Sequence, residues 1–176
     1  MMWKSFAILF LGMTPVLVKA VVPINDTNWL NHPEVRQIRS LYAAINVDQK
    51  AGTLKPESRA CVLYDGAVEI TGTTYKDHRR VIRKYTITAG TGDSMGTVEY
   101  YYDSRGVPRF TYKTNNAYNG TKKQDRIYFN TSGIHLYTNH RQEGVGYPQG
   151  GLDDVVRNPA AHYAQLCEES ILSNRV

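Results

Sequence analysis

The stretch TVEYYYDSRGVPRFTYKTNNAYNGTKKQDRIYFNTSGIHLY, residues 97–137, decides the fold class, because much of it alternates between apolar and polar side chains with a period of two. The alternation stops at DSRG, residues 103–106, and at NTSG, residues 130–133. Both tetrapeptides have the composition of tight turns. Short strands joined by such turns pair with their neighbours in sequence, so this stretch predicts an antiparallel β-meander.

The alternating pattern continues toward the N-terminus. Asp65-Gly66 separates two further alternating segments, and this dipeptide is a strong hairpin indicator. The polar run at 115–123 and the turn residues at 90–94 mark the other boundaries. The strands are expected at residues 59–64, 67–75, 80–89, 97–102, 107–114, 125–129 and 134–141.

Helical spacing of apolar residues appears at both ends of the chain. A helix is expected from His32 to Lys50, with Asn31 and Glu34 as its capping pair. Asn158 and Pro159 should open a second helix as cap and first residue. The predicted fold class is α+β: an antiparallel β-meander of about six to seven strands with an N-terminal and a C-terminal helix.

Residues 1–20 differ from the rest of the chain. Lys4 precedes the apolar run at 6–11, and Val18 and Ala20 occupy the small-residue positions that a signal peptidase reads. We expect a signal peptide cleaved after about Ala20, and a single domain at 21–176 that is secreted or periplasmic. The apolar run is too short to cross about 30 Å of hydrocarbon, so no membrane span is expected.

Charge and cysteine content narrow the classes of partner. The formal net charge is +5, and removal of residues 1–20 takes away two lysines and no acids, which leaves +3. This mildly basic balance permits anionic partners and does not call for nucleic acid. The two cysteines, Cys61 and Cys167, are expected to form a disulfide in an oxidising compartment. The alternative is a pair of buried free thiols.

The alternation divides the meander into two expected faces. One is apolar and should pack on a helix; it takes Val98, Tyr100, Tyr102, Phe110, Tyr112, Ile127, Phe129, Ile134 and Leu136. The other mixes tyrosines with cations, as recognition surfaces do, and takes Glu99, Tyr101, Arg109, Lys113, Arg126, Tyr128, His135, Tyr137 and Arg141. The candidate binding residues on it are Tyr101, Arg109, Arg126, Tyr128, His135, Tyr137 and Arg141. The alternative reading is an ordinary solvated sheet face, and a register slip would redistribute these residues.

The sequence carries no metal-binding motif, and no catalytic motif occurs in the context that its chemistry requires. No histidine pair has the helical spacing of a zinc protease. The Gly-x-Ser-x-Gly spacing occurs at residues 92–96, but it falls in a turn between two expected strands, whereas the catalytic turn of this type joins a strand to a helix. We therefore expect no metal, no cofactor and no catalytic residue. The leading hypothesis is a non-enzymatic binding protein of unknown ligand, whose partner is an anionic envelope glycan or another secreted protein. The alternative is a small envelope-directed hydrolase with its site in the Gly144–Asp154 loop and with His135 or His140 as acid/base.

Residues 100–147 contain a series of hairpin motifs. They are Tyr101-Tyr102-Asp103 with Gly106 and Phe110, the Asn119-Gly120-Thr121 turn, Arg126-Ile127-Tyr128-Phe129 with Gly133, and Gly146-Tyr147-Pro148. In these motifs the chain resembles an uncharacterised family of small secreted or periplasmic bacterial β-meander proteins. The resemblance implies a periplasmic setting and supplies no catalytic residue.

A second resemblance is to periplasmic lysozyme inhibitors, which are also small secreted β proteins. Their hallmark is a Ser-Gly-x-x-Tyr loop, whereas the segment from Ser132 to Tyr137 has one residue more between the glycine and the tyrosine. A mature charge of +3 would also repel a strongly basic lysozyme. Lysozyme inhibition is therefore a poorly matched alternative.

Overall fold

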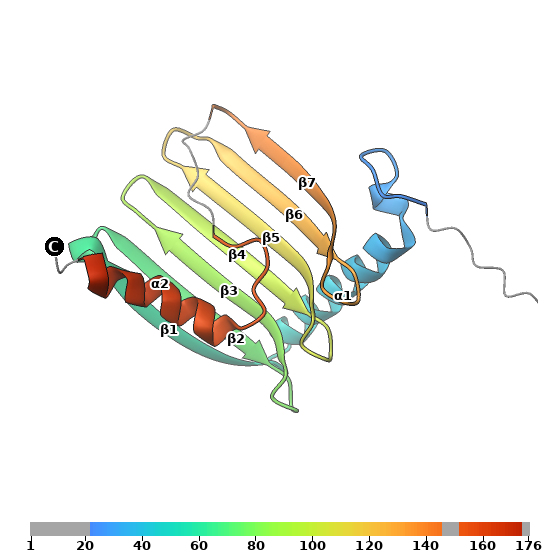
Figure 1. The fold of residues 1–176 in the computed structure, drawn as a ribbon, viewed down its shortest axis with the longest axis horizontal. Helices are drawn as coiled ribbons and strands as arrows, with labels where there is room; N and C mark the ends of the chain where they lie inside the picture. The colour runs from blue at the N-terminus through green and yellow to red at the C-terminus, as the bar shows by residue number, and fades with distance from the viewer. Residues whose placement is uncertain (1–21, 146–151, 174–176) are drawn as a thin grey trace, which may run out of the picture.

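Seven strands form one antiparallel sheet in sequence order, which confirms the predicted meander (Figure 1). The structure is a computed structural model, and it describes residues 22–145 and 152–173. The expected signal peptide and residues 146–151 of the Gly144–Asp154 loop lie outside the described residues. The strands are β1 (Lys55–Leu63), β2 (Val68–Lys76), β3 (Ile82–Gly90), β4 (Ser94–Tyr102), β5 (Pro108–Ala117), β6 (Lys122–Phe129) and β7 (His135–Glu143).

Two helices lie on opposite faces of this sheet, α1 (Pro33–Lys50) and α2 (Pro159–Ser173) (Figure 1). The α+β class is therefore confirmed. The predicted capping pair of α1 is wrong, because Asn31 belongs to a short 3₁₀ turn, Trp29–Asn31, and His32 is the N-cap. The predicted start of α2 is confirmed, because the backbone N–H of Ala161 donates to Oδ1 of Asn158 over 3.2 Å.

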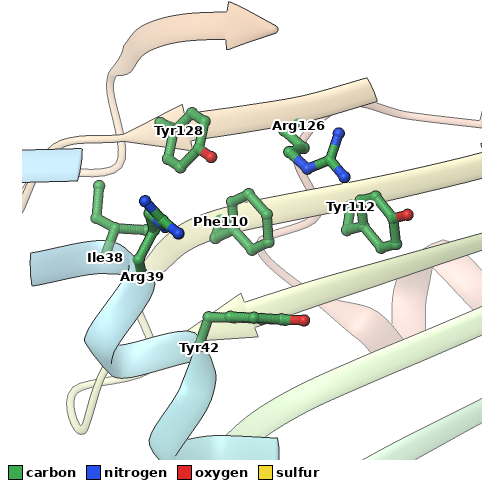
Figure 2. Close-up of a pocket in the computed structure, with 7 residues that line it drawn as sticks. All are labelled: Ile38, Arg39, Tyr42, Phe110, Tyr112, Arg126 and Tyr128. Carbon is green, nitrogen blue, oxygen red and sulfur yellow. The ribbon is translucent and has the colours of Figure 1, made fainter. Parts of the chain in front are cut away.

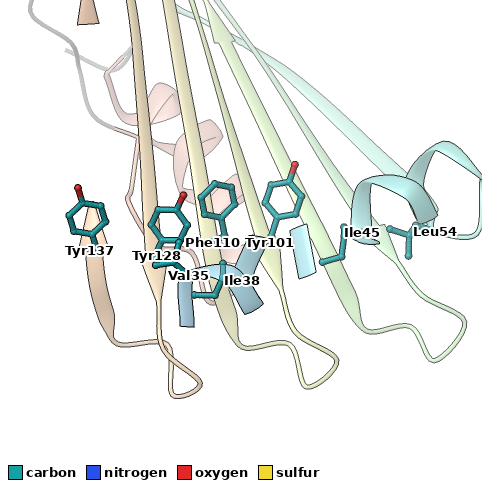
Figure 3. Close-up of a cluster of buried hydrophobic side chains, with 8 residues drawn as sticks. All are labelled: Val35, Ile38, Ile45, Leu54, Tyr101, Phe110, Tyr128 and Tyr137. Atoms are coloured by element: carbon teal, nitrogen blue, oxygen red, sulfur yellow. The ribbon is translucent and has the colours of Figure 1, made fainter. Parts of the chain in front are cut away.

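Helix α1 packs across the strands along a single row of aromatic side chains. Register places Tyr101, Phe110, Tyr128 and Tyr137 side by side on β4 to β7 (Figure 3). Val35, Ile38 and Ile45 of α1, together with Leu54, complete this buried cluster. Burying an apolar side chain of this size contributes roughly 1.5–3 kcal/mol, so this row is what holds α1 on the sheet.

The opposite face is covered by α2 and by the segment that leads into it. Its core contains Leu63, Ile70, Tyr85, Ile87, Val98, Tyr100, Tyr102 and Val156. The hydroxyls of Tyr100 and Tyr102 donate to the carbonyls of Asp153 and Val156 over 2.7 and 2.8 Å. These bonds fix the connecting segment against the centre of the sheet.

The predicted disulfide is present between Cys61 of β1 and Cys167 of α2. It ties the C-terminal helix to the first strand, and a disulfide is compatible with an extracytoplasmic location. Among the described residues, no helix is both long and apolar enough to cross a membrane.

The predicted division of the sheet faces is wrong for β5. Tyr101 pairs with Phe110 and Glu99 pairs with Tyr112, so Phe110 and Tyr112 share the face of Tyr101. Arg109 consequently lies on the opposite face. Alternation fixes which residues of one strand share a face, but the pairing across a turn decides which faces of two strands coincide.

A β-bulge changes the division again at the start of β7. Tyr128 pairs with Tyr137, but Phe129 pairs with His135, so Leu136 is an extra residue. The bulge moves His135 to the face opposite Tyr137, where its ring lies 6.3 Å from that of Phe129. A single inserted residue of this kind leaves no mark on the sequence pattern.

Candidate ligand-binding site

The predicted tyrosine and arginine face is only partly open, because α1 covers one row of it. Tyr101, Tyr128 and Tyr137 are 0, 2 and 9 % exposed, so these three rings do not form an open surface. Arg141 is exposed and pairs with Glu143 over 2.7 Å, away from the helix. Arg126 is half-buried beside the helix.

The other two predicted residues lie on the opposite face and do not join this group. Arg109 is buried, and its Nε donates to the carbonyl of Phe129 over 3.2 Å. His135 is exposed, and its Nε2 lies 2.8 Å from the hydroxyl of Thr138. Both contacts link neighbouring parts of the sheet locally.

A pocket of about 210 Å³ opens where α1 meets β5 and β6 (Figure 2). It is lined by Ile38, Arg39, Tyr42, Phe110, Tyr112, Arg126 and Tyr128. Two of the predicted residues, Arg126 and Tyr128, are therefore brought together there, and five more were missed. Helical spacing identified the apolar stripe of α1, but where that stripe docks is a tertiary contact that the pattern does not contain.

The shape of the pocket follows from regular geometry. On β5 and β6, Phe110 stands opposite Tyr128, and Tyr112 stands opposite Arg126. Cross-strand partners have Cβ atoms about 5 Å apart, so the four side chains form a compact square. Tyr42, one turn along α1 from Ile38, provides the helix wall.

The floor of the pocket is aromatic. The ring of Phe110 lies 5.0 Å from that of Tyr128 and 5.4 Å from that of Tyr42, the latter edge to face. The Tyr42 and Tyr112 side chains are half-buried at the rim. Neither of their hydroxyls has a hydrogen-bond partner in the part of the chain that the structure describes, so both can bond to a ligand or to water.

The two arginines make the pocket positive. Within residues 22–145 and 152–173, no carboxylate lies within 4.0 Å of either guanidinium. Burial raises the pKa of Tyr128, and the positive charges of Arg126 and Arg39 oppose that rise. Both cations therefore act on the same ring at the pocket floor.

Arg126 is held in place more firmly than Arg39. Its guanidinium carbon lies 5.1 Å from the centre of the Tyr112 ring, and one of its nitrogens donates to Oε1 of Gln124 over 3.2 Å. Arg39 is exposed on the helix surface. Figure 2 shows the two guanidinium groups on opposite sides of the Phe110 ring.

A buried polar network borders the pocket on the side of the sheet centre. The ammonium of Lys84 contacts Oε1 of Glu99 at 2.6 Å and the side-chain oxygens of Gln49 and Asn46 at 3.0 and 3.2 Å. The hydroxyl of Tyr101 donates to Oε2 of Glu99 over 2.8 Å. Burial and the charge of Glu99 raise the pKa of Tyr101, so this hydroxyl stays protonated. The carboxylate nearest the pocket along the sheet is thus already engaged.

Beyond this network the open part of the face is rich in hydroxyls, with the exposed carboxylate of Glu69 at its far edge. Register places on it Ser58, Thr71, Thr73, Thr86, Thr88, Thr97 and Thr114. Thr86 is the cross-strand neighbour of Glu99, and Thr97 is that of Thr114. A ligand longer than the pocket would therefore meet hydroxyl groups on its way across the sheet.

The residues proposed for the hydrolase alternative, His135, His140 and the described part of the Gly144–Asp154 loop, do not line the pocket. Nδ1 of His140 lies 2.8 Å from Oδ1 of Asp125, on the face opposite the pocket. The centre of the Gly144–Asp154 loop lies outside the described residues, while Leu152 and Asp154 at its end contact Lys113. The described residues contain no group of three or more side chains suited to hold a metal ion.

Comparisons with protein-family models, with curated proteins and with solved structures find no match to this chain. Its function is therefore inferred from the pocket itself.

Proposed function

We propose that this is a secreted or periplasmic binding protein, without enzymatic activity, that holds an anionic ligand in the pocket between α1, β5 and β6. The observation that carries the proposal is the pair Arg39 and Arg126, which has no carboxylate partner in the described part of the chain and flanks an aromatic floor. Concave, mostly apolar sites with a few polar groups are the usual form of small-ligand sites.

The charge of the pocket selects the class of ligand. Guanidinium groups prefer carboxylate, sulfate or phosphate oxygens, and such bonds are about twice as strong as neutral ones. The pocket volume of about 210 Å³ lies below the roughly 300–1,000 Å³ of sites for drug-sized ligands. It would accept one ring or small group of a larger ligand, and an acidic glycan offers such groups in series.

The first experiment measures binding of the purified protein to two acidic polysaccharides, polygalacturonate and hyaluronate, with neutral dextran as reference. We expect at least one acidic polymer to bind and dextran not to bind. The double variant Arg39→Gln, Arg126→Gln should weaken binding by about tenfold or more, since each tenfold corresponds to about 1.4 kcal/mol, the contribution of one charged hydrogen bond.

A matched control separates the pocket from general attraction between opposite charges. The double variant Arg36→Gln, Lys122→Gln removes the same charge from α1 and β6 at exposed positions that do not line the pocket. It should bind nearly as the unmodified protein does. Equal losses in both double variants, or no binding to either acidic polymer, would refute the proposal.

A further inference from the structure

The interior of the pocket offers two kinds of contact side by side. Phe110 and Tyr128, which are 6 and 2 % exposed, form an apolar aromatic floor, and Tyr42, Tyr112 and the two arginines complete the lining. A small aromatic floor with tyrosine and arginine side chains beside it suits a sugar ring, which has C–H faces and a rim of oxygens. An acidic sugar would add the carboxylate that the cations require.

The two cations are not equivalent partners for that carboxylate. Arg126 is half-buried, stacked on Tyr112 and bonded to Gln124, so it loses little freedom when it binds an anion. Arg39 is exposed, and its charge is better solvated. A sugar ring lying over Phe110 would therefore place its carboxylate on Arg126, and Arg39 would donate to oxygens on the opposite side of the ring.

The surroundings of the pocket restrict the next unit of a glycan chain. Toward the sheet centre, a chain crosses Tyr112 and reaches its cross-strand neighbour Glu99, whose side chain is 25 % exposed. Lys84 lies behind that carboxylate, is 4 % exposed and already contacts three acceptors. Within the described residues, the cation paired with Glu99 is therefore already engaged, and a second acidic unit would stand beside the exposed part of that carboxylate.

A neutral unit suits the same position. Thr86 and Thr97 lie beyond Glu99 on β3 and β4, and their half-buried hydroxyls can donate to and accept from sugar hydroxyls. The charge pattern along the face is therefore positive at the pocket and uncharged or weakly negative toward the centre. This pattern is complementary to a chain in which acidic and neutral sugars alternate.

We propose, on the basis of the proposed function, that the pocket holds one acidic sugar ring with its carboxylate on Arg126, and that the neighbouring ring toward the sheet centre is uncharged. The ligand class is thus a glycan with alternating acidic and neutral units, and glycans with an acid on every unit bind less tightly. Like charges brought together at an interface are strongly disfavoured, which makes the difference measurable.

The test compares two oligosaccharides of equal length by isothermal titration calorimetry with the full protein. One is a hyaluronate tetrasaccharide, which alternates acidic and neutral rings, and the other is tetragalacturonate, in which every ring is acidic. We expect the hyaluronate tetrasaccharide to bind about tenfold more tightly at low salt. Free glucuronate should compete for the pocket, and glucose should not.

Three variants locate the effect. Arg126→Gln should weaken binding of the hyaluronate tetrasaccharide several-fold more than Arg39→Gln does. Glu99→Gln should reduce the preference between the two tetrasaccharides, and circular dichroism at the titration temperature establishes that this variant is folded. If the Glu99→Gln variant is not folded, the relative affinity of the unmodified protein for the two tetrasaccharides is the test of the inference.

The outcomes distinguish this inference from the proposed function. If tetragalacturonate binds as tightly as the hyaluronate tetrasaccharide and both need Arg126, the inference is overturned and the proposed function stands. If neither tetrasaccharide nor either polymer binds, both fail. An Arg39→Gln loss larger than that of Arg126→Gln would overturn the placement of the carboxylate.

Discussion

Replacing Glu99 with Gln should destabilise the fold, because it removes the negative charge that neutralises a buried ammonium. Lys84 is 4 % exposed and contacts Glu99 over 2.6 Å, while its two other partners are neutral side-chain oxygens. Breaking a buried ion pair from one side typically costs about 3–5 kcal/mol. Glu99 is a quarter exposed and the two neutral acceptors remain, so we expect a smaller loss of about 2 kcal/mol.

The measurement is urea denaturation followed by far-ultraviolet circular dichroism at neutral pH. A loss of about 2 kcal/mol is a large part of the 5–15 kcal/mol by which proteins are usually stable, so the midpoint should move clearly. Lys84→Met, added to the Glu99→Gln variant, removes the uncompensated charge and keeps most of the side-chain volume. It should restore about 1 kcal/mol of the free energy of unfolding.

A decrease in the free energy of unfolding of less than about 0.5 kcal/mol in Glu99→Gln would show that Glu99 does not stabilise the buried ammonium of Lys84. The same conclusion follows if the losses of stability from Glu99→Gln and from Lys84→Met, each measured alone, simply add in the double variant. Additivity would mean that Lys84 and Glu99 do not interact, since residues in one network should couple by at least about 0.5 kcal/mol.

Three further predictions concern the packing of α2. Reducing the Cys61–Cys167 bond, or replacing both cysteines with Ala, should lower the free energy of unfolding by up to about 4.7 kcal/mol in the chain-entropy model, because the bond links residues 106 positions apart. An unchanged urea midpoint would contradict this prediction. Burial lowers the pKa of His162, so as the pH falls the unfolded chain takes up a proton before the folded protein does. The contribution of His162 to stability is therefore present above about pH 6.5 and is lost as the pH falls below that value. His162→Phe should flatten the measured dependence of stability on pH. Gly72→Val should lower the free energy of unfolding by about 1–3 kcal/mol, since a Cβ there would lie 2.6 Å from the Tyr163 ring. If that clash is the cause, adding Tyr163→Ala to the Gly72→Val variant should recover part of the loss of melting temperature.

Much of the fold could be predicted because its signals are local. Turn chemistry such as Asp65-Gly66 placed the hairpins, and the helix expected at 32–50 is observed from Pro33 to Lys50. The disulfide was also predicted, from the presence of two cysteines and from the oxidising compartment expected for a secreted protein. Within the elements themselves the errors lay at their ends, as with the capping role expected of Asn31, where neighbouring backbone geometry decides the outcome.

The candidate site was only partly predictable. Arg126 and Tyr128 were identified from alternation, because both lie on one strand and differ by two positions. Their partners Phe110 and Tyr112 were assigned to the wrong face, since the register between two strands is not written in either strand alone. Arg39 could not be predicted as a site residue, because the sequence pattern of an exposed helix surface does not show whether a pocket lies next to a given arginine.

Local sequence signals suffice to give the elements and their order: a helix, seven alternating segments joined by short turns, and a second helix. These depend on periodicity and turn propensity, which act over a few residues. That α1 lies over the row of Tyr101, Phe110, Tyr128 and Tyr137, covers this row and leaves a pocket at its border is a result of tertiary packing. The physical reason is that docking depends on shape and area summed over residues far apart in the chain, and no local pattern records that sum.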